Sequence, residues 1–424
     1  MPKNIFVVGL DDFNHALLEP IGKKKGYRFH SLLAANEVKW QKNYVPEELL
    51  GKAEERLKSF SGSIDAIVGY WDFPTTCLVP YLNQKMGLSG PSLQSVLKCE
   101  HKYWSRVEQS QVTQDIPKFC AFNPYDKDLR TRIDLAYPFW IKPVKSFASQ
   151  LGFRIHNDKD FEESIALICE GIERFSTPFN YFLNQVSRPQ SVADISGEFC
   201  IAESIISGRQ CTLEGYVYHG QVEVYGVIDS IREPNRSTFA RYQYPSHLPK
   251  RIQQRMTVAA QTVMNHLHYD NAPFNIEFFY DEHHDRIWLL EINPRISQSH
   301  CDIFRKVDGA SHHEVMIDLA LGNQPNFPKR NGDFHSAAKF FFRTHNNGVL
   351  KQVPNQEQIQ RVKERFPDTL INIHVKEGMR PSDLPGQESY SYDLGYVCIG
   401  ADNEHALLEN HRKCLEILKF EFSQ

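Results

Sequence analysis

The most constraining stretch of this sequence is residues 274–295, in which two apolar runs flank a short charged turn. The runs are rich in β-branched and aromatic residues, and this pattern predicts a β-hairpin. Each run carries one carboxylate among its apolar residues, Glu277 in the first and Glu291 in the second. Asn293 shares the face of Glu291, because side chains alternate along a strand with period two.

The two carboxylates stand opposite each other if the turn consists of residues 283–285. Like charges directly opposite are destabilising unless something positive lies between them. A hard divalent cation meets this need, and Mg²⁺ held by one or two carboxylates plus substrate phosphates fits best. The alternative is a solvated hairpin face with two unrelated glutamates, and the spacing alone leaves both interpretations open.

This hairpin also resembles a known family. Glu277, followed by Glu-Ile-Asn-Pro-Arg at residues 291–295, is similar to the metal-binding end of the ATP-grasp fold. The family includes D-alanine–D-alanine ligase, biotin carboxylase, glycinamide ribonucleotide synthetase and the L-amino acid ligases. The resemblance implies that ATP and Mg²⁺ are the cofactors, with Mn²⁺ as an alternative metal. It implies that the metal ligands are Glu277, Glu291 and Asn293, and that the catalytic Arg295 faces the reacting carboxylate.

Bulk properties narrow the class of protein. A chain of 424 residues is too long for one ordinary core, so we expect two or three domains. The net charge of −4 gives no sign of a nucleic-acid or anionic-membrane partner. No run approaches the roughly 18 apolar residues of a membrane span, and the N-terminus shows no secretory signal. The nine cysteines contain no Cys-x-x-Cys, which favours reduced thiols in a cytoplasmic protein.

The first part of the chain alternates between apolar runs and helical stretches, which predicts an open parallel α/β sheet. A Gly-x-Gly-x-x-Gly loop is missing after the first run, so we expect no dinucleotide site there. The resemblance likewise implies a Rossmann-like first domain that does not hold the nucleotide. The expected strands are residues 4–10, 27–33 and 64–70, and the expected helices are residues 15–25 and 47–60.

Ser92 is a plausible N-cap for a helix that runs to about residue 109. Lys98 and Lys102, four positions apart, are expected on one face of it. A solvated side chain is the ordinary state of a helical lysine. By its place in the chain, however, Lys102 is similar to the family lysine that contacts ATP phosphate, although His101 replaces the aspartate that often precedes it.

Lys142 ends an apolar strand expected over residues 136–143, and a lysine in such a place costs free energy unless an anion meets it. The small polar residues of 144–152 suit phosphate oxygens. Together they resemble the nucleotide lysine of the family and the loop that closes over the phosphates. The loop holds a single glycine, unlike the usual pattern, and an ordinary strand connection is the alternative. The candidate donors in the loop are Lys145, Ser146 and Ser149.

A further apolar run over residues 199–206 contains one carboxylate, Glu203. In the family this stretch is the hinge between the two lobes that clasp ATP. The resemblance implies that Glu203 and the backbone at Ile205 and Ile206 bind the adenine. Gln210 takes the place of an acid that often contacts the ribose.

The substrate side is less defined. Residues 211–229 read as a second hairpin with Gly220 in its turn, and Glu214 is the polar residue inside it. Ser297 and His300 follow the metal-binding hairpin where the family has residues beside the acyl substrate. His300 has an alternative as a capping or packing histidine. The substrate candidates are therefore Glu214, Ser297 and His300.

Two pairs of adjacent histidines are candidate metal ligands: His283–His284 and His312–His313. Adjacent side chains diverge on a strand and lie about 100° apart on a helix, so neither pair makes a good bidentate site. We expect solvated turn or helix surface for both pairs.

The expected fold class is α/β and α+β, in the ATP-grasp arrangement. Residues 1–112 would form the N-terminal Rossmann-like parallel α/β domain, and residues 113–328 the two-lobed ATP-grasp domain. Its small lobe would cover about residues 113–205 and its large lobe about residues 206–328. Residues 329–424 would form a small C-terminal α+β domain.

The resemblance implies an ATP-dependent ligase that activates a carboxylate as an acyl phosphate and joins it to an amine. Its partners would be a small-molecule carboxylate and amine, without nucleic acid or membrane, and a homodimer is common in the family. One alternative is a carboxylase of the biotin carboxylase kind, which would need a biotin-carrying partner. Another is a nucleotide-binding regulatory protein with a decayed active site.

Overall fold

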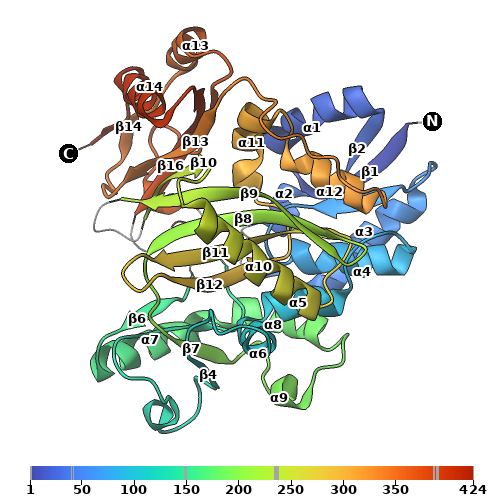
Figure 1. The fold of residues 1–424 in the computed structure, drawn as a ribbon, viewed down its shortest axis with the longest axis vertical. Coiled ribbons are helices and arrows are strands. Elements are labelled where there is room, and N and C mark those ends of the chain that lie inside the picture. Colours follow the sequence, from blue (N-terminus) through green and yellow to red (C-terminus); the bar gives the residue numbers. More distant parts are fainter. Residues whose placement is uncertain are drawn as a thin grey trace.

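The structure, a computed structural model, describes residues 2–39, 41, 43–147, 150–233, 238–384, 387 and 391–423. A long antiparallel sheet runs through the middle of the molecule, with the N-terminal α/β unit (blue) beside it (Figure 1). A smaller sheet (teal to green) lies on the side of β12, and the C-terminal segment (orange to red) lies at the opposite edge. These parts enclose the candidate site described below.

The N-terminal unit is a parallel sheet in the order β2-β1-β3, which confirms the predicted parallel α/β architecture. The apolar run of β1 is buried between layers, as its composition predicts. The side chain of Asp11 caps the first helix by accepting from the backbone N–H of Asn14. The strands are β1 (Lys3–Leu10), β2 (Tyr27–Ala34) and β3 (Ala66–Gly69), and the helices are α1 (Asp12–Lys25), α2 (Ala35–Val38), α3 (Pro46–Ser59) and α4 (Thr75–Met86).

The single helix predicted over residues 92–109 is wrong, because the chain forms α5 (Leu93–Glu100) and α6 (Lys102–Ser110) with a break at His101. His101 has extended backbone angles, and its ring Nδ1 accepts from the Trp104 backbone N–H at 3.2 Å. Burial lowers the pKa of His101 to about 4, which keeps this nitrogen free to accept.

The break at His101 also separates the two lysines that were expected on one face. Lys98 forms an ion pair with Glu108 at 3.3 Å. Lys102 instead forms an ion pair with Glu291, in the hairpin of residues 274–295, at 2.9 Å. The break therefore turns Lys102 toward the candidate site.

The small lobe is a four-stranded antiparallel sheet in the order β4-β7-β5-β6. Its apolar face packs around Phe139, Phe161 and Ile168, which are buried. The strands are β4 (Phe119–Phe122), β5 (Phe139–Pro143), β6 (Phe153–Ile155) and β7 (Cys200–Ser204). The helical segments are η1 (Leu129–Arg132), α7 (Asp158–Gly171), α8 (Glu173–Leu183) and α9 (Gln190–Ala193).

The large sheet has eight antiparallel strands in the order β12-β11-β8-β9-β10-β13-β16-β15. Its last three strands come from the C-terminal part of the chain, so this one sheet crosses the domain boundary predicted at residues 328–329. That boundary stays a prediction. The strands are β8 (Arg209–Tyr218), β9 (Gln221–Arg232), β10 (Phe239–Tyr244), β11 (Ala272–Asp281), β12 (Arg286–Asn293), β13 (Ser336–Thr344), β15 (Leu370–Ile373) and β16 (Tyr392–Ala401). Helix α10 (Lys250–His266) contacts β8, β9, β11 and β12.

Three helical segments follow the β11–β12 hairpin: η2 (Gln298–His300), α11 (Cys301–Asp308) and α12 (His312–Ala320). A buried cluster joins Ile296, Met316 and Ile317 to Ile5 and Val68 of the N-terminal sheet. This packing fixes the N-terminal unit against the large lobe. No helix in the described ranges is both long and apolar enough to span a bilayer.

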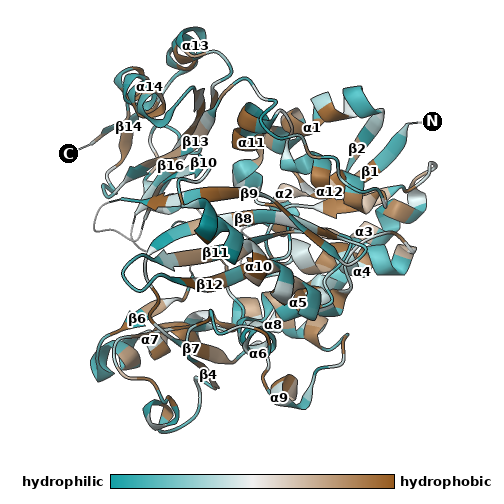
Figure 2. Cartoon of the chain, in the orientation of Figure 1, coloured by the Kyte–Doolittle hydropathy of each residue, from teal (hydrophilic) through white to brown (hydrophobic). Residues whose placement is uncertain are grey.

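The C-terminal segment builds its own core around Phe340, Val362 and Leu407. Val362 is the one buried residue of α13, which is mainly teal in Figure 2 and so presents a polar surface. The remaining elements are β14 (Leu350–Gln352), α13 (Gln356–Arg365), η3 (Pro381–Asp383), α14 (Glu404–Ile417) and β17 (Glu421–Phe422).

Arg106 on α6 connects the two lobes. Its Nε donates to Glu203 of β7 at 2.6 Å, and its terminal nitrogens donate to the carbonyl oxygens of Leu289 and Leu290 on β12 at 3.2 and 2.6 Å. Burial alone would raise the pKa of Glu203, but the charges of Arg106 and Lys142 outweigh it and hold that pKa at about 2. A buried, fully ionised contact therefore lies at the junction of the lobes.

We predict that Arg106→Met destabilises the protein by about 3 kcal/mol, because it leaves Glu203 with one cation fewer and two β12 carbonyls without a donor. Chemical unfolding followed by circular dichroism would measure this loss. Arg251→Met is the matched control: Arg251 pairs with Asp285 on the surface, and exposed pairs contribute about 0–1 kcal/mol. Equal stability of the two variants would contradict the prediction.

We also predict an acid-sensitive contact in the C-terminal core. The His411 ring stacks on Phe340 at 3.9 Å between centroids, and burial lowers its pKa from 6.5 to about 4. Between these values the unfolded chain binds more protons than the folded one, so stability is lost as the pH falls from about 6.5 to 4. His411→Phe keeps the stacking and removes the titration. Between pH 7 and 4, the free energy of unfolding of the wild type should fall by on the order of 3 kcal/mol more than that of this variant. Parallel pH dependences of the two unfolding free energies would refute the role of His411.

Candidate active site

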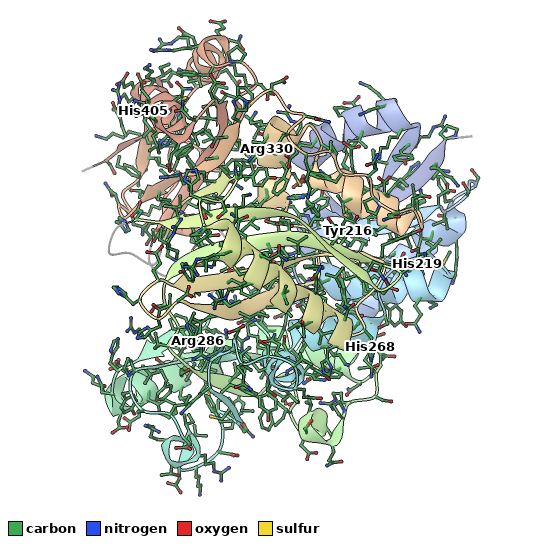
Figure 3. All side chains as sticks on the ribbon, in the orientation of Figure 1. Tyr216, His219, His268, Arg286, Arg330 and His405 are labelled. Atoms are coloured by element: carbon green, nitrogen blue, oxygen red, sulfur yellow. The ribbon has the colours of Figure 1, made fainter. Side chains whose placement is uncertain are left out.

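The β11–β12 hairpin sets the geometry of the site. Glu277 pairs directly opposite Glu291, as the hairpin pattern predicts. The turn has four residues, 282–285, and not the three we expected, and a β-bulge between Glu277 and Phe278 restores the register. Arg286, labelled in Figure 3, marks the start of β12.

The two facing carboxylates have different surroundings. Burial alone would raise the pKa of Glu291, but the charges of Lys102, Lys142 and Lys145 outweigh it and hold that pKa at about 2. The pKa of Glu277 is raised by burial and by the charge of Glu291, against the opposing charge of Arg295. Lys102 therefore neutralises Glu291, whereas no ion pair to Glu277 occurs among the described residues.

Amide side chains surround Glu277. Its Oε2 accepts from Gln210 Nε2 at 2.7 Å, and Asn293 Nδ2 lies 3.4 Å from its Oε1. The same Asn293 nitrogen donates to Asn275 Oδ1 at 2.9 Å, so the Asn293 carbonyl oxygen stays free for another partner. The face thus offers two carboxylates and one amide oxygen, which are the oxygen ligands that Mg²⁺ prefers.

The expected phosphate lysines lie on the small-lobe side of this face. Lys102 Nζ contacts Glu291 and also donates to the Ser146 carbonyl oxygen at 2.8 Å. Lys142 forms an ion pair with Glu203 at 2.8 Å. Burial lowers the pKa of Lys102, against the charge of Glu291. The structure thus pairs Lys102 with Glu291 and Lys142 with Glu203, and the expected contact of both lysines with phosphate stays a prediction.

The loop after β5 differs from expectation at one position. Lys145, a predicted phosphate donor, is buried in an ion pair with Glu100. The charge of Glu100 outweighs burial and raises the pKa of Lys145. This lysine therefore holds the loop base against α5. Ser146 is buried beside it, and Ser149 lies outside the described residues.

The expected hinge lies between β7 and β8. Ile205 and Ile206 are half-buried in the connecting loop, while the Glu203 side chain is engaged by Arg106 and Lys142. Gly208 in this loop has φ +130°, and a Cβ there would lie 2.2 Å from the Tyr280 carbonyl oxygen, so the close approach to β11 requires glycine. Gln210 is bound at Glu277 and accepts from Arg232 at 2.7 Å.

Arg295 reaches across to the N-terminal unit. Its Nε and Nη2 donate to Asp72 Oδ1 at 2.7 and 2.5 Å. Burial would lower the pKa of Arg295, but the charge of Asp72 raises it. Sequence reasoning missed Asp72. Its position just after β3, at the carboxyl end of a parallel strand, is the signal that would have pointed to it.

A cavity of about 270 Å³ opens between Arg295 and the N-terminal unit. Glu277, Asn293 and Ser297 line it from the large lobe, so the cavity adjoins the carboxylate face. Lys39 also lines it, with its Nζ 3.8 Å from the centroid of the Trp71 ring. The remaining wall combines aromatic side chains with small polar ones. The aromatic side chains include Tyr44, Trp71, Phe73, Phe147, Phe239 and Tyr242, and the polar ones include Thr212, Ser230, Asn275, Gln298 and Ser299.

The substrate candidates separate into two groups. Ser297 lines the cavity, and so does His300, whose Nδ1 lies 2.7 Å from Glu214 Oε1. Glu214 itself is completely buried and does not line the cavity. Burial raises the pKa of Glu214 and lowers that of His300 to about 3, so burial disfavours the charged form of both groups.

The expectation for the histidine pairs is right for one and wrong for the other. His283 and His284 are exposed in the hairpin turn. His312 and His313 are completely buried, although we expected a solvated helix surface. They lie at the start of α12, which packs between the N-terminal sheet and the large lobe.

The sequence comparisons agree with this geometry. Residues 135–302 match the family described as "ATP-grasp domain". Urea amidolyase from Saccharomyces cerevisiae is 22% identical over 323 residues, which are 75% of this chain and 16% of that protein. The carbamoyl phosphate synthase large chain of Xylella fastidiosa is 22% identical over 244 residues. This chain spans only 16 to 20% of the lengths of these curated relatives.

Among solved structures, the L-amino acid ligase from Bacillus licheniformis superposes with a TM-score of 0.72 at 15% identity, covering 100% of this chain and 99% of that one. This similarity in fold extends over the whole chain, whereas the domain boundaries and the site residues stay predictions. Residues 135–302 therefore match an ATP-grasp domain in sequence, and the chain as a whole shares the fold of the L-amino acid ligase structure.

Proposed function

We propose that this protein is an ATP- and Mg²⁺-dependent ligase that activates a small carboxylate as an acyl phosphate and joins it to an amine, releasing ADP and phosphate. One observation carries the proposal: the carboxylate face of Glu277 and Glu291, with Lys102 beside it, adjoins a cavity that Arg295 lines. Phosphoryl transfer needs mainly positioning and charge neutralisation, and this arrangement offers both.

Glu277, Glu291 and Asn293 would hold the metal, since Glu277 lacks a cation of its own and faces a second carboxylate. The bound metal supplies neutralisation of charge on phosphate oxygens, and we propose that Mn²⁺ substitutes for Mg²⁺ in this role. Lys102 leaves its contact with Glu291 to bind phosphate in this proposal. Lys142 binds phosphate from the other side.

The nucleotide would lie between the lobes. We propose that Glu203 and the Ile205–Ile206 backbone bind the adenine. Gln210 would border the ribose. Ser146 and Ser149 would donate hydrogen bonds to phosphate oxygens. The Gln210 amide, held between Glu277 and Arg232, would couple this region to the metal ligands.

We place the two organic substrates in the 270 Å³ cavity. Arg295 presents a planar guanidinium that suits the reacting carboxylate or the acyl phosphate oxygens. Ser297 and His300 border the same space. We propose that the aromatic side chains of the wall shield an acyl phosphate from water while the amine attacks.

Phosphate release from ATP and Mg²⁺, measured against an array of amino acids, other small acids and amines, tests this proposal. Release that needs both a carboxylate and an amine supports the ligase. Release with bicarbonate and free biotin instead would support a carboxylase. The fold similarity to biotin carboxylase from Campylobacter jejuni favours this alternative (TM-score 0.65, 14% identity, covering 100% of this chain and 92% of that one). ATP binding without release in any mixture would indicate a regulatory nucleotide-binding protein.

Two broader properties accompany the proposal. All nine cysteines lie in the described residues and are free thiols, which favours a cytoplasmic location. The homodimer implied by the family resemblance is tested by sedimentation of the purified chain.

We predict that Glu277→Gln lowers turnover by on the order of 10²–10³, because it removes a charged metal ligand and keeps the shape of the side chain. The measurement is phosphate release at saturating ATP, with the Mg²⁺ concentration varied. Glu282→Gln is the matched control: Glu282 lies in the turn of the same hairpin and contacts only Arg209 among the described ion pairs. Near wild-type turnover of Glu277→Gln would remove Glu277 from the site.

A further inference from the structure

A second group of ligand-type side chains lies behind the cavity. Glu214 on β8, His300 at the end of η2 and His312 at the start of α12 converge from three separate elements. Their exposed fractions are 0%, 3% and 0%. One ligand atom from each lies within 4.8 Å of the others. Tyr216, labelled in Figure 3, follows Glu214 by two residues on β8 and marks the place.

Some polar atoms of this cluster remain unpaired within the part of the chain that the structure describes. Glu214 Oε2 and the Nε2 atoms of His300 and His312 are buried, and none has a hydrogen-bond partner among the described residues. In the same described residues, Glu214 makes ion-pair contacts only with the two histidines. Leaving a buried polar group unpaired costs about 1–3 kcal/mol. Glu214 Oε2 and His312 Nε2 lie 4.0 Å apart, so one positively charged partner between them would satisfy both atoms.

The spacing suits a metal ion. His300 Nδ1 lies 2.7 Å from Glu214 Oε1, and His312 Nε2 lies 4.0 Å from Glu214 Oε2. Metal–ligand distances of about 2.0–2.1 Å in a tetrahedral site separate two ligand atoms by about 3.3 Å. The two observed distances lie on either side of this value, and all three ligand atoms lie within 4.8 Å of one another. The donor atoms are therefore already gathered close to the spacing of a tetrahedral site.

A neighbouring group already orients one of the histidines. Tyr225 Oη lies 2.7 Å from Nδ1 of His312, which directs the opposite ring nitrogen, Nε2, toward Glu214. Metal-ligating histidines almost always use their other ring nitrogen in this way, because the contact fixes the ring orientation. Tyr225 is itself completely buried, so the contact is sheltered from water.

We propose that Glu214, His300 and His312 form a zinc site. Two imidazole nitrogens and one carboxylate oxygen are a donor set that Zn²⁺ accepts readily, whereas Mg²⁺ prefers oxygen ligands alone. The site is therefore chemically distinct from the carboxylate face of Glu277 and Glu291. It connects β8 to η2 and α12, the segments that follow Arg295, and so stabilises that part of the cavity wall. The proposal does not depend on the ligase activity.

The test begins with the wild-type chain, purified without a polyhistidine tag and without chelator. Elemental analysis should find about one zinc per chain. After removal of the metal, titration with Co²⁺ in the absence of nucleotide and Mg²⁺ should produce the intense visible absorption of a four-coordinate cobalt ion. Zinc should displace the cobalt and raise the melting temperature of the apoprotein.

Matched variants locate the metal. Glu214→Gln keeps an acceptor for His300, and His312→Gln removes one ligand, and each should weaken zinc affinity at least tenfold. His313→Gln is the control, because His313 is equally buried on the same helix turn and lies outside the cluster. The double variant His283→Ala/His284→Ala controls for binding at the exposed histidine pair. Both controls should retain the metal.

Three results would overturn the proposal. They are less than about 0.1 zinc per chain with no cobalt spectrum in the wild type, unchanged affinity in His312→Gln, or loss of the metal in His283→Ala/His284→Ala. If a cluster variant fails to fold, as judged by circular dichroism, the wild-type stoichiometry and cobalt spectrum decide the question. Because no readout uses turnover, a failed ligase assay and an absent zinc site remain distinguishable.

Discussion

The structure depends on how the charges of two carboxylates that face each other across one hairpin are compensated. Glu277 and Glu291 are opposite in register, and like charges in such pairs are destabilising. Lys102 of α6 forms an ion pair with Glu291, whereas the described residues offer Glu277 amide donors from Gln210 and Asn293. The break at His101 turns Lys102 to Glu291, and Arg106 holds α6 to the hairpin. Because only Glu291 is paired with a lysine in the described residues, Glu277 is the carboxylate that a bound cation would neutralise.

Local patterns allowed much of this to be predicted from the sequence. The hairpin, the parallel N-terminal strands and the turn at Gly220 all follow from period-two patterns and short-range turn signals. The same reasoning failed at His101, because it treated residues 92–109 as one helix and histidine is not among the usual N-cap residues. A single side chain accepting from Trp104 decided the local structure.

Long-range packing explains the other errors. The exposure of His312 and His313 cannot be inferred from α12 alone, since their burial depends on the docking of α12 between the N-terminal sheet and the large lobe. Asp72 contacts Arg295 across 223 positions of sequence, and no short motif reports such a pairing. Lys145 was assigned to phosphate because its neighbours are polar, but its partner, Glu100, comes from a separate helix. Each miss concerns a contact between elements, which periodicity does not encode.

Strand β8 links the two candidate sites physically. Gln210 and Glu214 are four residues apart, so the period-two alternation of a strand directs both to the same face of the sheet. Gln210 donates to Glu277, and Glu214 contacts His300, which lines the cavity beside Arg295. One rigid strand therefore sets the distance between the carboxylate face and the buried histidines. An ion held by Glu214, His300 and His312 would fix the segment that follows Arg295 relative to β8. The metal ligands would then hold this part of the cavity wall in place, and the segment would not need hydrogen bonds of its own to do so.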